Sequence, residues 1–114
     1  MTNCVITLCT CGSREEAKRL AAILVEERLA ACVNILPGVH SVYRWQGKVE
    51  TASEHLLFMK TTEERQRALE RRIGELHSYD TPELISLAIV SGSKKYLTWV
   101  ADQVSQEDGA EHPA

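Results

Sequence analysis

Long apolar runs and an excess of positive charge are both missing from this 114-residue sequence. No apolar stretch approaches the ~20 residues of a membrane-spanning helix, and the N-terminus lacks the basic start and apolar block of a signal peptide. The 13 lysines and arginines are outnumbered by 16 acidic residues, so the basic stripe that attracts nucleic acids is absent. We therefore expect a cytosolic, cytoplasmic protein with no membrane and no nucleic-acid partner.

Catalytic motifs are missing as well. The sequence has no Ser-His-Asp order, no nucleophile elbow and no metalloprotease helix motif. Glu50 and Glu54 form a candidate carboxylate pair, but we expect both to be solvated on a strand, without the apolar neighbours that tune a catalytic acid. Gly12 stands without the further glycines of a phosphate-binding loop. We expect that the protein is not an enzyme.

The spacing of cysteine and histidine argues against a disulfide scaffold and against a structural zinc site. A secreted scaffold spreads its cysteines to join distant loops, whereas here all four lie in the first third of the chain. No two of the four histidines have the short spacing of structural zinc ligands. We expect free thiols, some of them buried as small hydrophobic side chains. The cysteines are Cys4, Cys9, Cys11 and Cys32.

What the sequence does contain is a succession of strand and helix patterns. Runs rich in β-formers predict strands at residues 3–10, 32–45, 48–60 and 84–90. Pro37-Gly38 marks a bulge or bend, because proline cannot donate a ladder hydrogen bond and glycine accepts unusual dihedral angles. Gln46-Gly47 marks the tight turn of a hairpin between the second and third strands.

Capping boxes predict where two helices begin. Ser13-Arg14-Glu15-Glu16 starts a helix that continues to about Leu29, and Thr61-Thr62-Glu63-Glu64 starts a second helix with an inner apolar stripe. Residues 77–83 show no periodicity and contain a proline, which predicts a loop. A short helix follows the last strand. We expect one domain over residues 1–105 and a disordered acidic tail over residues 106–114.

The predicted element order is βαββαβ followed by a C-terminal helix. The simplest closure is an α+β fold of the ferredoxin-like type, in which an antiparallel sheet carries both main helices on one face. A Rossmann-type sheet is the alternative. The long hairpin argues against it, because parallel neighbours need a crossover connection.

Two features of the sheet predict an oligomer. Hairpin strands of about 13 residues reach ~43 Å, whereas a compact chain of this length is roughly 34 Å across, so the hairpin projects and leaves open edges. The runs LISLAIV and LLFM are apolar on both faces, and two helices cover only one face. We expect a partner subunit to cover the other face; the alternative is that the third helix folds over it.

Five runs of the sequence are spaced consistently over residues 3–104: LCT (8–10), LAACVNILPGVHSVYRWQGKVE (29–50), KTT (60–62), LHSYDTPELISLAI (76–89) and YLTWV (96–100). These runs resemble the CutA divalent-cation tolerance proteins. The resemblance implies a ferredoxin-like homotrimer, similar to the nitrogen-regulatory signalling trimers, with a role in tolerance to divalent metals and to copper in particular. Ser78, Asp80 and Thr81 depart from the Pro, Glu and Val of many members.

The same resemblance points to a metal site. Cys9 and His77 match positions implicated in copper binding in a bacterial member, whereas Leu76 stands where that member has a second histidine. Thiolate and imidazole suit copper and zinc. Cys11 projects from the same strand face as Cys9, and Glu83 either completes the site or pairs with a cation of a neighbouring subunit. The alternative is that Cys9 is a core thiol and His77 a hydrogen-bonded loop residue.

The hairpin turn is a second candidate site. Tyr43, Arg44 and Trp45 beside the turn are predicted to anchor the trimer, or else to form a small-molecule cleft between subunits. Cys32 is predicted to be a packing residue at the interface rather than a ligand. Three functions follow: a trimer that binds copper or another divalent metal, a signalling trimer that binds an anionic metabolite between subunits, and a scaffold for other proteins.

Overall fold

The computed structural model describes residues 2–105. Seven elements follow one another in the predicted order of strands and helices. The expected acidic tail, 106–114, lies outside the described residues. Among those residues, no helix is both long enough and apolar enough to cross a membrane. The elements are β1 (Cys4–Cys11), α1 (Arg14–Glu26), β2 (Cys32–Trp45), β3 (Lys48–Thr62), α2 (Glu63–Leu76), β4 (Leu84–Ala88) and α3 (Lys94–Gln103).

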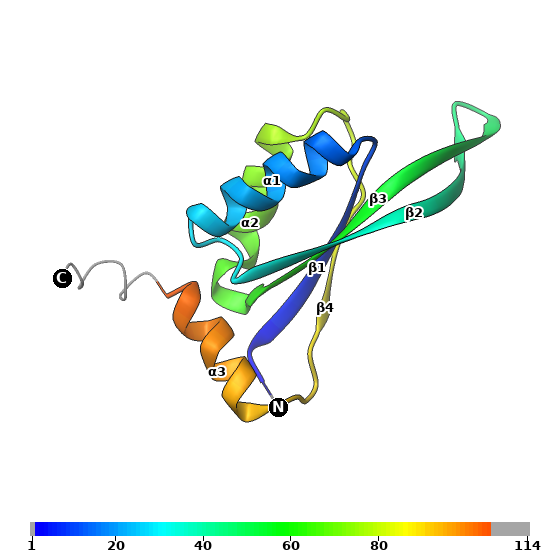
Figure 1. Cartoon of the computed structure of the whole chain (residues 1–114). Coiled ribbons are helices and arrows are strands. Elements are labelled where there is room, and N and C mark those ends of the chain that lie inside the picture. Colours follow the sequence, from blue (N-terminus) through cyan, green and yellow to red (C-terminus); the bar gives the residue numbers. More distant parts are fainter. Residues whose placement is uncertain (1, 106–114) are drawn as a thin grey trace.

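The four strands form one sheet in the order β2-β3-β1-β4. Every pair in it is antiparallel. α1 and α2 lie over the same face of the sheet, and α3 packs near the end of the sheet from which the chain starts (Figure 1). The predicted α+β class is therefore confirmed, and the Rossmann alternative is wrong because the sheet has no parallel pair.

The main core lies between the sheet and the two long helices. Side chains at every second position of β1 and β3 point toward the helices, as the period of a strand requires. They meet the inner stripes of α1 and α2, and the stripe predicted for the second helix is buried at Leu69 and Ile73. The fully buried members of this core include Cys9, Cys11, Leu20, Leu24, Leu57, Met59, Leu69 and Ile73.

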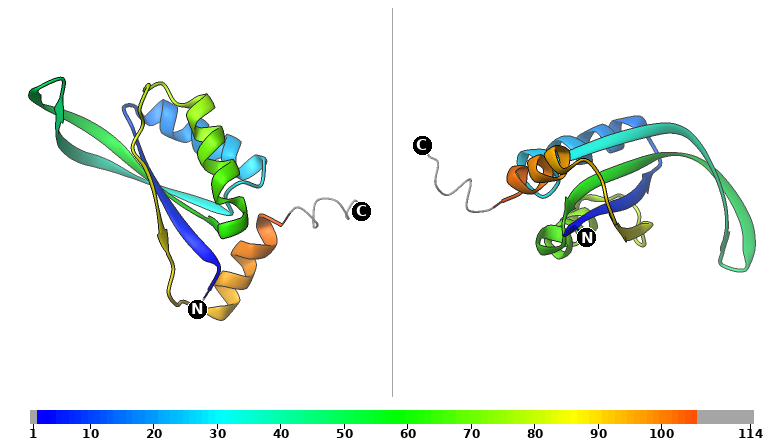
Figure 2. Two further views of the ribbon diagram at one scale, coloured as in Figure 1. Left: turned by 180° about the vertical axis from the view of Figure 1, so that it is seen from behind. Right: turned by 90° about the horizontal axis from the view of Figure 1, so that it is seen from below.

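The hairpin of β2 and β3 projects from this body, as predicted. Gln46 and Gly47 have φ angles of 49° and 81°, the left-handed values that a tight hairpin turn needs. The strand register shifts between Leu36 and Val39, next to Gly38 at φ 76°, so the predicted bulge is confirmed. The molecule measures 51 Å along its longest axis but only 28 and 21 Å across, and the projecting hairpin is curved along its length (Figure 2).

Several predicted element boundaries were wrong by one to three residues, among them the ends of β1 and β3, which run to Cys11 and Thr62. α1 ends at Glu26 rather than near Leu29, because Arg28 adopts a left-handed φ of 59°. The second capping box does not form: Thr61 belongs to β3, and Thr62 at the helix start makes no side-chain cap hydrogen bond. β4 ends at Ala88, two residues before the predicted end.

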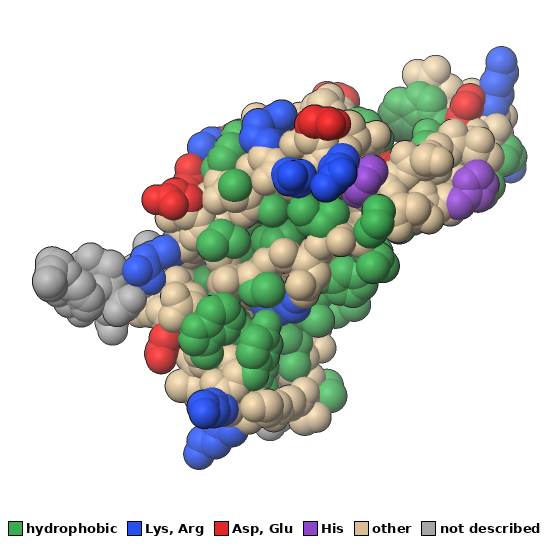
Figure 3. All heavy atoms as spheres, viewed as in Figure 1, with side chains coloured by type: hydrophobic (Ala, Val, Ile, Leu, Met, Phe, Trp, Pro, Cys, Tyr) green, Lys and Arg blue, Asp and Glu red, His purple; other side chains and the backbone are tan. Residues whose placement is uncertain are grey.

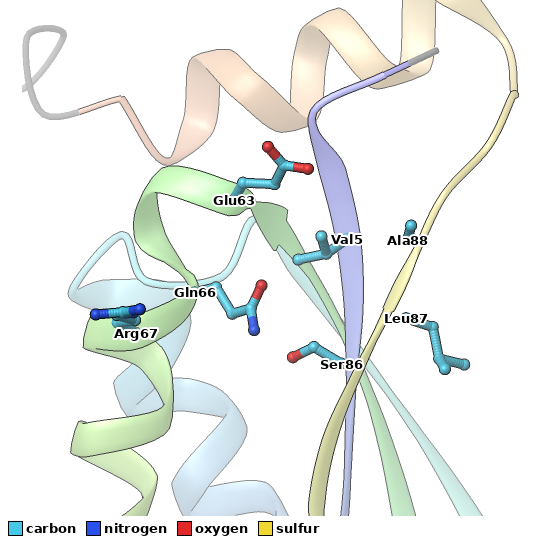
Figure 4. Close-up of a pocket in the computed structure, with 7 residues that line it drawn as sticks. All are labelled: Val5, Glu63, Gln66, Arg67, Ser86, Leu87 and Ala88. Atoms are coloured by element: carbon cyan, nitrogen blue, oxygen red, sulfur yellow. The ribbon is translucent and has the colours of Figure 1, made fainter.

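One face of the sheet is left largely uncovered by the described residues. Along β4, Ser86 points toward α2 and Leu87 points away from it (Figure 4). Leu87 is 51% exposed and Ile85 is 50% exposed, so the apolar residues of this face lie open in the single chain, as the apolar pattern of the strand predicted. α3 covers only one end of this face, in a small cluster around Cys4 and Val100. Hydrophobic side chains gather over α3 and the adjoining sheet (Figure 3).

Candidate metal centre and adjoining groove

Two thiols and one imidazole meet at the end of β1. Cys9 and Cys11 lie two residues apart on this strand and point to the same face, as predicted, while His77 follows the last residue of α2. Their ligand atoms all lie within 4.8 Å of one another, and all three side chains are buried. Within residues 2–105 this is the one group of three cysteine, histidine or acidic side chains placed to hold a single metal ion.

Hydrogen bonds to the backbone fix the ring of His77. Its Nδ1 accepts from the amide of Tyr79 at 3.0 Å, because an amide N–H only donates. Its Nε2 lies 2.8 Å from the carbonyl oxygen of Thr10, which only accepts, so Nε2 carries the proton. These bonds tie the loop to β1, as the alternative structural interpretation of His77 expects. Nε2 also lies 3.8 Å from Cys11 Sγ.

The carboxylate of Glu16 faces this cluster. The sequence predicted instead that this carboxylate caps the start of the helix. Ser13 accepts from the amide of Glu16 at 3.1 Å, so one half of the first capping box is confirmed. The carboxylate of Glu16 instead accepts from the amide and the hydroxyl of Ser78, at 2.7 and 3.0 Å. Its Oε2 lies 3.6 Å from His77 Nδ1. Glu16 therefore orients the loop and supplies a buried negative charge behind the imidazole.

The Cys11 thiol and burial both stabilise the protonated form of Cys9. A hydrogen bond with Cys11 raises the pKa of Cys9 far above its ordinary value, and burial adds to the shift. The remaining polar contact of Cys9 Sγ is long, 3.7 Å from the carbonyl oxygen of Thr10. A ligand that prefers thiolates must therefore displace the Cys9 proton.

Glu83 is not part of the cluster. It lines a groove of about 650 Å³ on the neighbouring side of the loop, where the hairpin bends past residues 79–83. Its charge still acts on Cys9, whose pKa it helps to raise. The groove is lined by Thr10, Ser41, Val42, Tyr43, Trp45, Glu54, Tyr79, Asp80, Thr81, Pro82 and Glu83.

Glu54 lies in the wall of this groove, and the expectation that it is solvated was wrong. The residue is only 7% exposed, because the hairpin and the loop enclose it, whereas Glu50 is exposed as expected. The Tyr79 hydroxyl donates to its Oε2 at 2.9 Å. Burial and this carboxylate raise the pKa of Tyr79 to about 12.

The residues predicted for the interface lie partly at the groove and partly at the start of β2. Tyr43 and Trp45 line the groove and are 45% and 52% exposed, while Arg44 on the opposite side of β2 is not among the lining residues. Cys32 is half-buried at the start of β2, with Lys60 Nζ 3.8 Å from its Sγ. Their contacts with a second subunit stay predictions.

A second hollow, of about 410 Å³, lies between the start of α2 and the strands β1 and β4 (Figure 4). Its charged lining is mixed in sign, with Glu63 and Arg67. The lining contains neither cysteine nor histidine, so this hollow offers no soft metal ligand.

Known proteins resemble this chain over nearly all of its described length. Residues 5–103 match the family model of the CutA1 divalent ion tolerance protein. The divalent-cation tolerance protein CutA of Thermus thermophilus is 47% identical over 97 residues, which cover 85% of this chain and 94% of that protein. The chloroplastic protein CutA of Arabidopsis thaliana is 47% identical over 96 residues, 84% of this chain. This match spans only 53% of the Arabidopsis protein, about half its length.

Solved structures agree with the sequence matches. The structure of the periplasmic divalent cation tolerance protein CutA from Archaeoglobus fulgidus superposes with a TM-score of 0.87 at 37% identity. The superposition covers 90% of this chain and 99% of that one. The names of these relatives place them in more than one compartment, a chloroplast and a periplasm.

Proposed function

This chain belongs to the CutA1 divalent ion tolerance protein family, and we propose that it binds copper, or zinc or another soft divalent cation, at Cys9, Cys11 and His77. One observation carries the proposal: two thiols and an imidazole converge within 4.8 Å in a buried place. Sulfur and imidazole nitrogen are the donors that these metals prefer. The family is named for tolerance of ions and not for a reaction. We propose that the protein is a cytosolic binding protein and not an enzyme.

Metal binding through His77 requires a change of tautomer. Nε2 faces the thiols and carries the ring proton, so that proton must leave and the other nitrogen must carry one. A proton on Nδ1 would face the Glu16 carboxylate, 3.6 Å away. Carboxylate, imidazole and metal in a row is a recurring arrangement that raises the basicity of the ligand. Glu16 thus acts as a positioning residue, and the Tyr79 amide loses its acceptor.

We further propose that the chain assembles as a ferredoxin-like homotrimer. The support is the exposed apolar surface of the single chain, which includes Ile85 and Leu87 on the uncovered face and Val42 and Val49 on the projecting hairpin. Apolar surface of this extent favours association. Tyr43, Arg44 and Trp45 are the proposed anchors, since aromatic and arginine side chains carry much of the energy of interfaces.

Calorimetric titration of the reduced protein with copper in the absence of oxygen tests the metal site. We expect the double variant Cys9→Ser, His77→Ala to lose binding, while Cys4→Ser retains it. Cys4 is the matched control because its thiol is equally buried, 2% exposed, but lies at the far end of β1. Equal copper affinity in all three proteins contradicts the proposed site. Cys11→Ser provides a second variant that leaves the loop anchor at His77 intact.

A further inference from the structure

The groove beside the metal cluster combines acidic and aromatic side chains without a basic one. Asp80, Glu83 and the buried Glu54 supply carboxylates, and Tyr43, Tyr79 and Trp45 supply aromatic rings, while no lysine or arginine lines it. Its volume of about 650 Å³ lies within the usual range of small-molecule sites. Both kinds of lining group attract cations, the carboxylates by charge and hydrogen bonding and the rings through their π faces.

Glu54 is the strongest indication of a missing partner. Glu54 is only 7% exposed. Within residues 2–105, the Tyr79 hydroxyl is the one hydrogen-bond partner of its carboxylate. No lysine, arginine or histidine of the described chain forms an ion pair with it. Removing a carboxylate from water is unfavourable unless a cation or several hydrogen bonds replace the lost solvation. A cationic ligand in the groove supplies both.

The arrangement of the carboxylates selects an organic cation over a metal ion. Their oxygens do not converge: the cysteine–histidine cluster is the one three-ligand metal group in the described chain. They are spread along a groove much larger than a bare ion. We propose that this groove binds a small aliphatic ammonium compound, with an ammonium group against Glu54, its carbon chain against Trp45 and Tyr43, and Glu83 or Asp80 available to a second cationic group.

The ligand inferred here is a cation, whereas the sequence suggested an anion. An anionic metabolite was the ligand considered for clefts near the hairpin turn. The lining of this groove would repel an anion, because its charged side chains are Glu54, Asp80 and Glu83. A lysine or arginine from a second copy of the chain has the same headgroup chemistry as an aliphatic ammonium compound. The test must therefore separate a free ligand from a neighbouring subunit.

Titration with 1,4-diaminobutane tests the proposal on the full chain. Trp45 fluorescence in a Trp99→Phe background reports on the groove, and calorimetry provides the affinity. We expect saturable binding that weakens at high salt, and no binding of butane-1,4-diol, which has a similar length without charge. Glu54→Gln should weaken binding by roughly tenfold or more, the loss expected for a charge-assisted hydrogen bond. Glu50→Gln is the matched control, because Glu50 is exposed and does not line the groove.

Each contrary outcome overturns the proposal. Equal affinities in Glu54→Gln and Glu50→Gln, or equal binding of diol and diamine, exclude recognition of charge at Glu54. Tyr43 and Trp45 are also the proposed anchors of the trimer, and the two roles compete where a partner covers the groove. Absence of diamine binding in an oligomer that shields Trp45 therefore shows that a second copy fills the groove. Trp45→Leu is a variant that should fold, since Trp45 is 52% exposed, and it should weaken binding in calorimetry. A Cys9→Ser, Cys11→Ser double variant should retain diamine binding, so failure of the metal site leaves this result unaffected.

Discussion

Residues 77–83 connect two neighbouring regions that differ in burial and in the donors they offer. On one side, His77 completes a buried cluster whose other members are two thiols. On the other side, Tyr79 and Glu83 line an open groove with carboxylates and aromatic rings. Sulfur and imidazole nitrogen are the donors of the closed site, and carboxylates and aromatic rings line the open groove. The two sides of this loop are therefore suited to different kinds of ligand.

The largest expected effect is the loss of metal binding when both thiols are removed. Cys9→Ser, Cys11→Ser should lower copper affinity by at least roughly a hundredfold, because hydroxyl groups are poor ligands for soft metals. Diamine binding in the groove should stay unchanged. Calorimetry with each ligand on the same variant measures both. Parallel loss of the two ligands would show that cluster and groove are one site.

Metal binding should also depend steeply on pH. The raised pKa of Cys9 keeps its thiol protonated at neutral pH, so a bound metal must displace that proton. Affinity therefore rises with pH, by roughly tenfold per pH unit for each thiol proton that is released. Chelator competition at several pH values measures the slope. Cys11→Ser should make the dependence of copper affinity on pH less steep. Diamine binding should show no comparable dependence on pH, because the proposed binding mode of the diamine releases no proton.

A smaller effect is expected at Glu16. Glu16→Gln retains an oxygen that accepts from Ser78 but removes the charge behind His77, so copper affinity should fall by roughly tenfold. Glu15→Gln is the matched control, since Glu15 is exposed in the same first turn of α1. Equal affinities in the two variants would leave Glu16 with a structural role only. The dependence of affinity on pH distinguishes the roles further, because only a positioning residue changes the basicity of the ligand.

The elements of the fold were predictable because their signals are local. Residues 32–45 matched β2, since Pro37-Gly38 and Gln46-Gly47 mark a bulge and a turn within the segment itself. The period of a strand likewise placed Cys9 and Cys11 on one face. Thr61 failed as a cap because the pairing of β3 with β1 continues through Thr62, which no local motif reveals.

The features of the two regions that the sequence did not predict depend on contacts between residues far apart in the chain. Glu16 fitted a capping box, so nothing in the sequence indicated that its carboxylate binds Ser78, 62 positions away. Glu54 was expected to be solvated on its strand, without apolar neighbours. The bend of the hairpin toward residues 79–83 encloses it. An acidic residue that must be buried has no sequence signature when its enclosing segments come from another part of the chain.

The smallest effect is expected for a substitution at Gly12, which acts on the groove through Tyr79. A Cβ added there would lie 2.8 Å from the Tyr79 hydroxyl, so Gly12→Ala must displace the ring and weaken its hydrogen bond to Glu54. We expect a loss of about 1 kcal/mol in the free energy of unfolding, measured in urea, together with weaker diamine binding. Gly74→Ala is the control: its Cβ meets no atom within 4 Å, and alanine favours helix α2, so stability should rise. Copper affinity should be unchanged in both variants. A gain in stability for Gly12→Ala would show that the contact between Tyr79 and Glu54 does not hold the groove in shape.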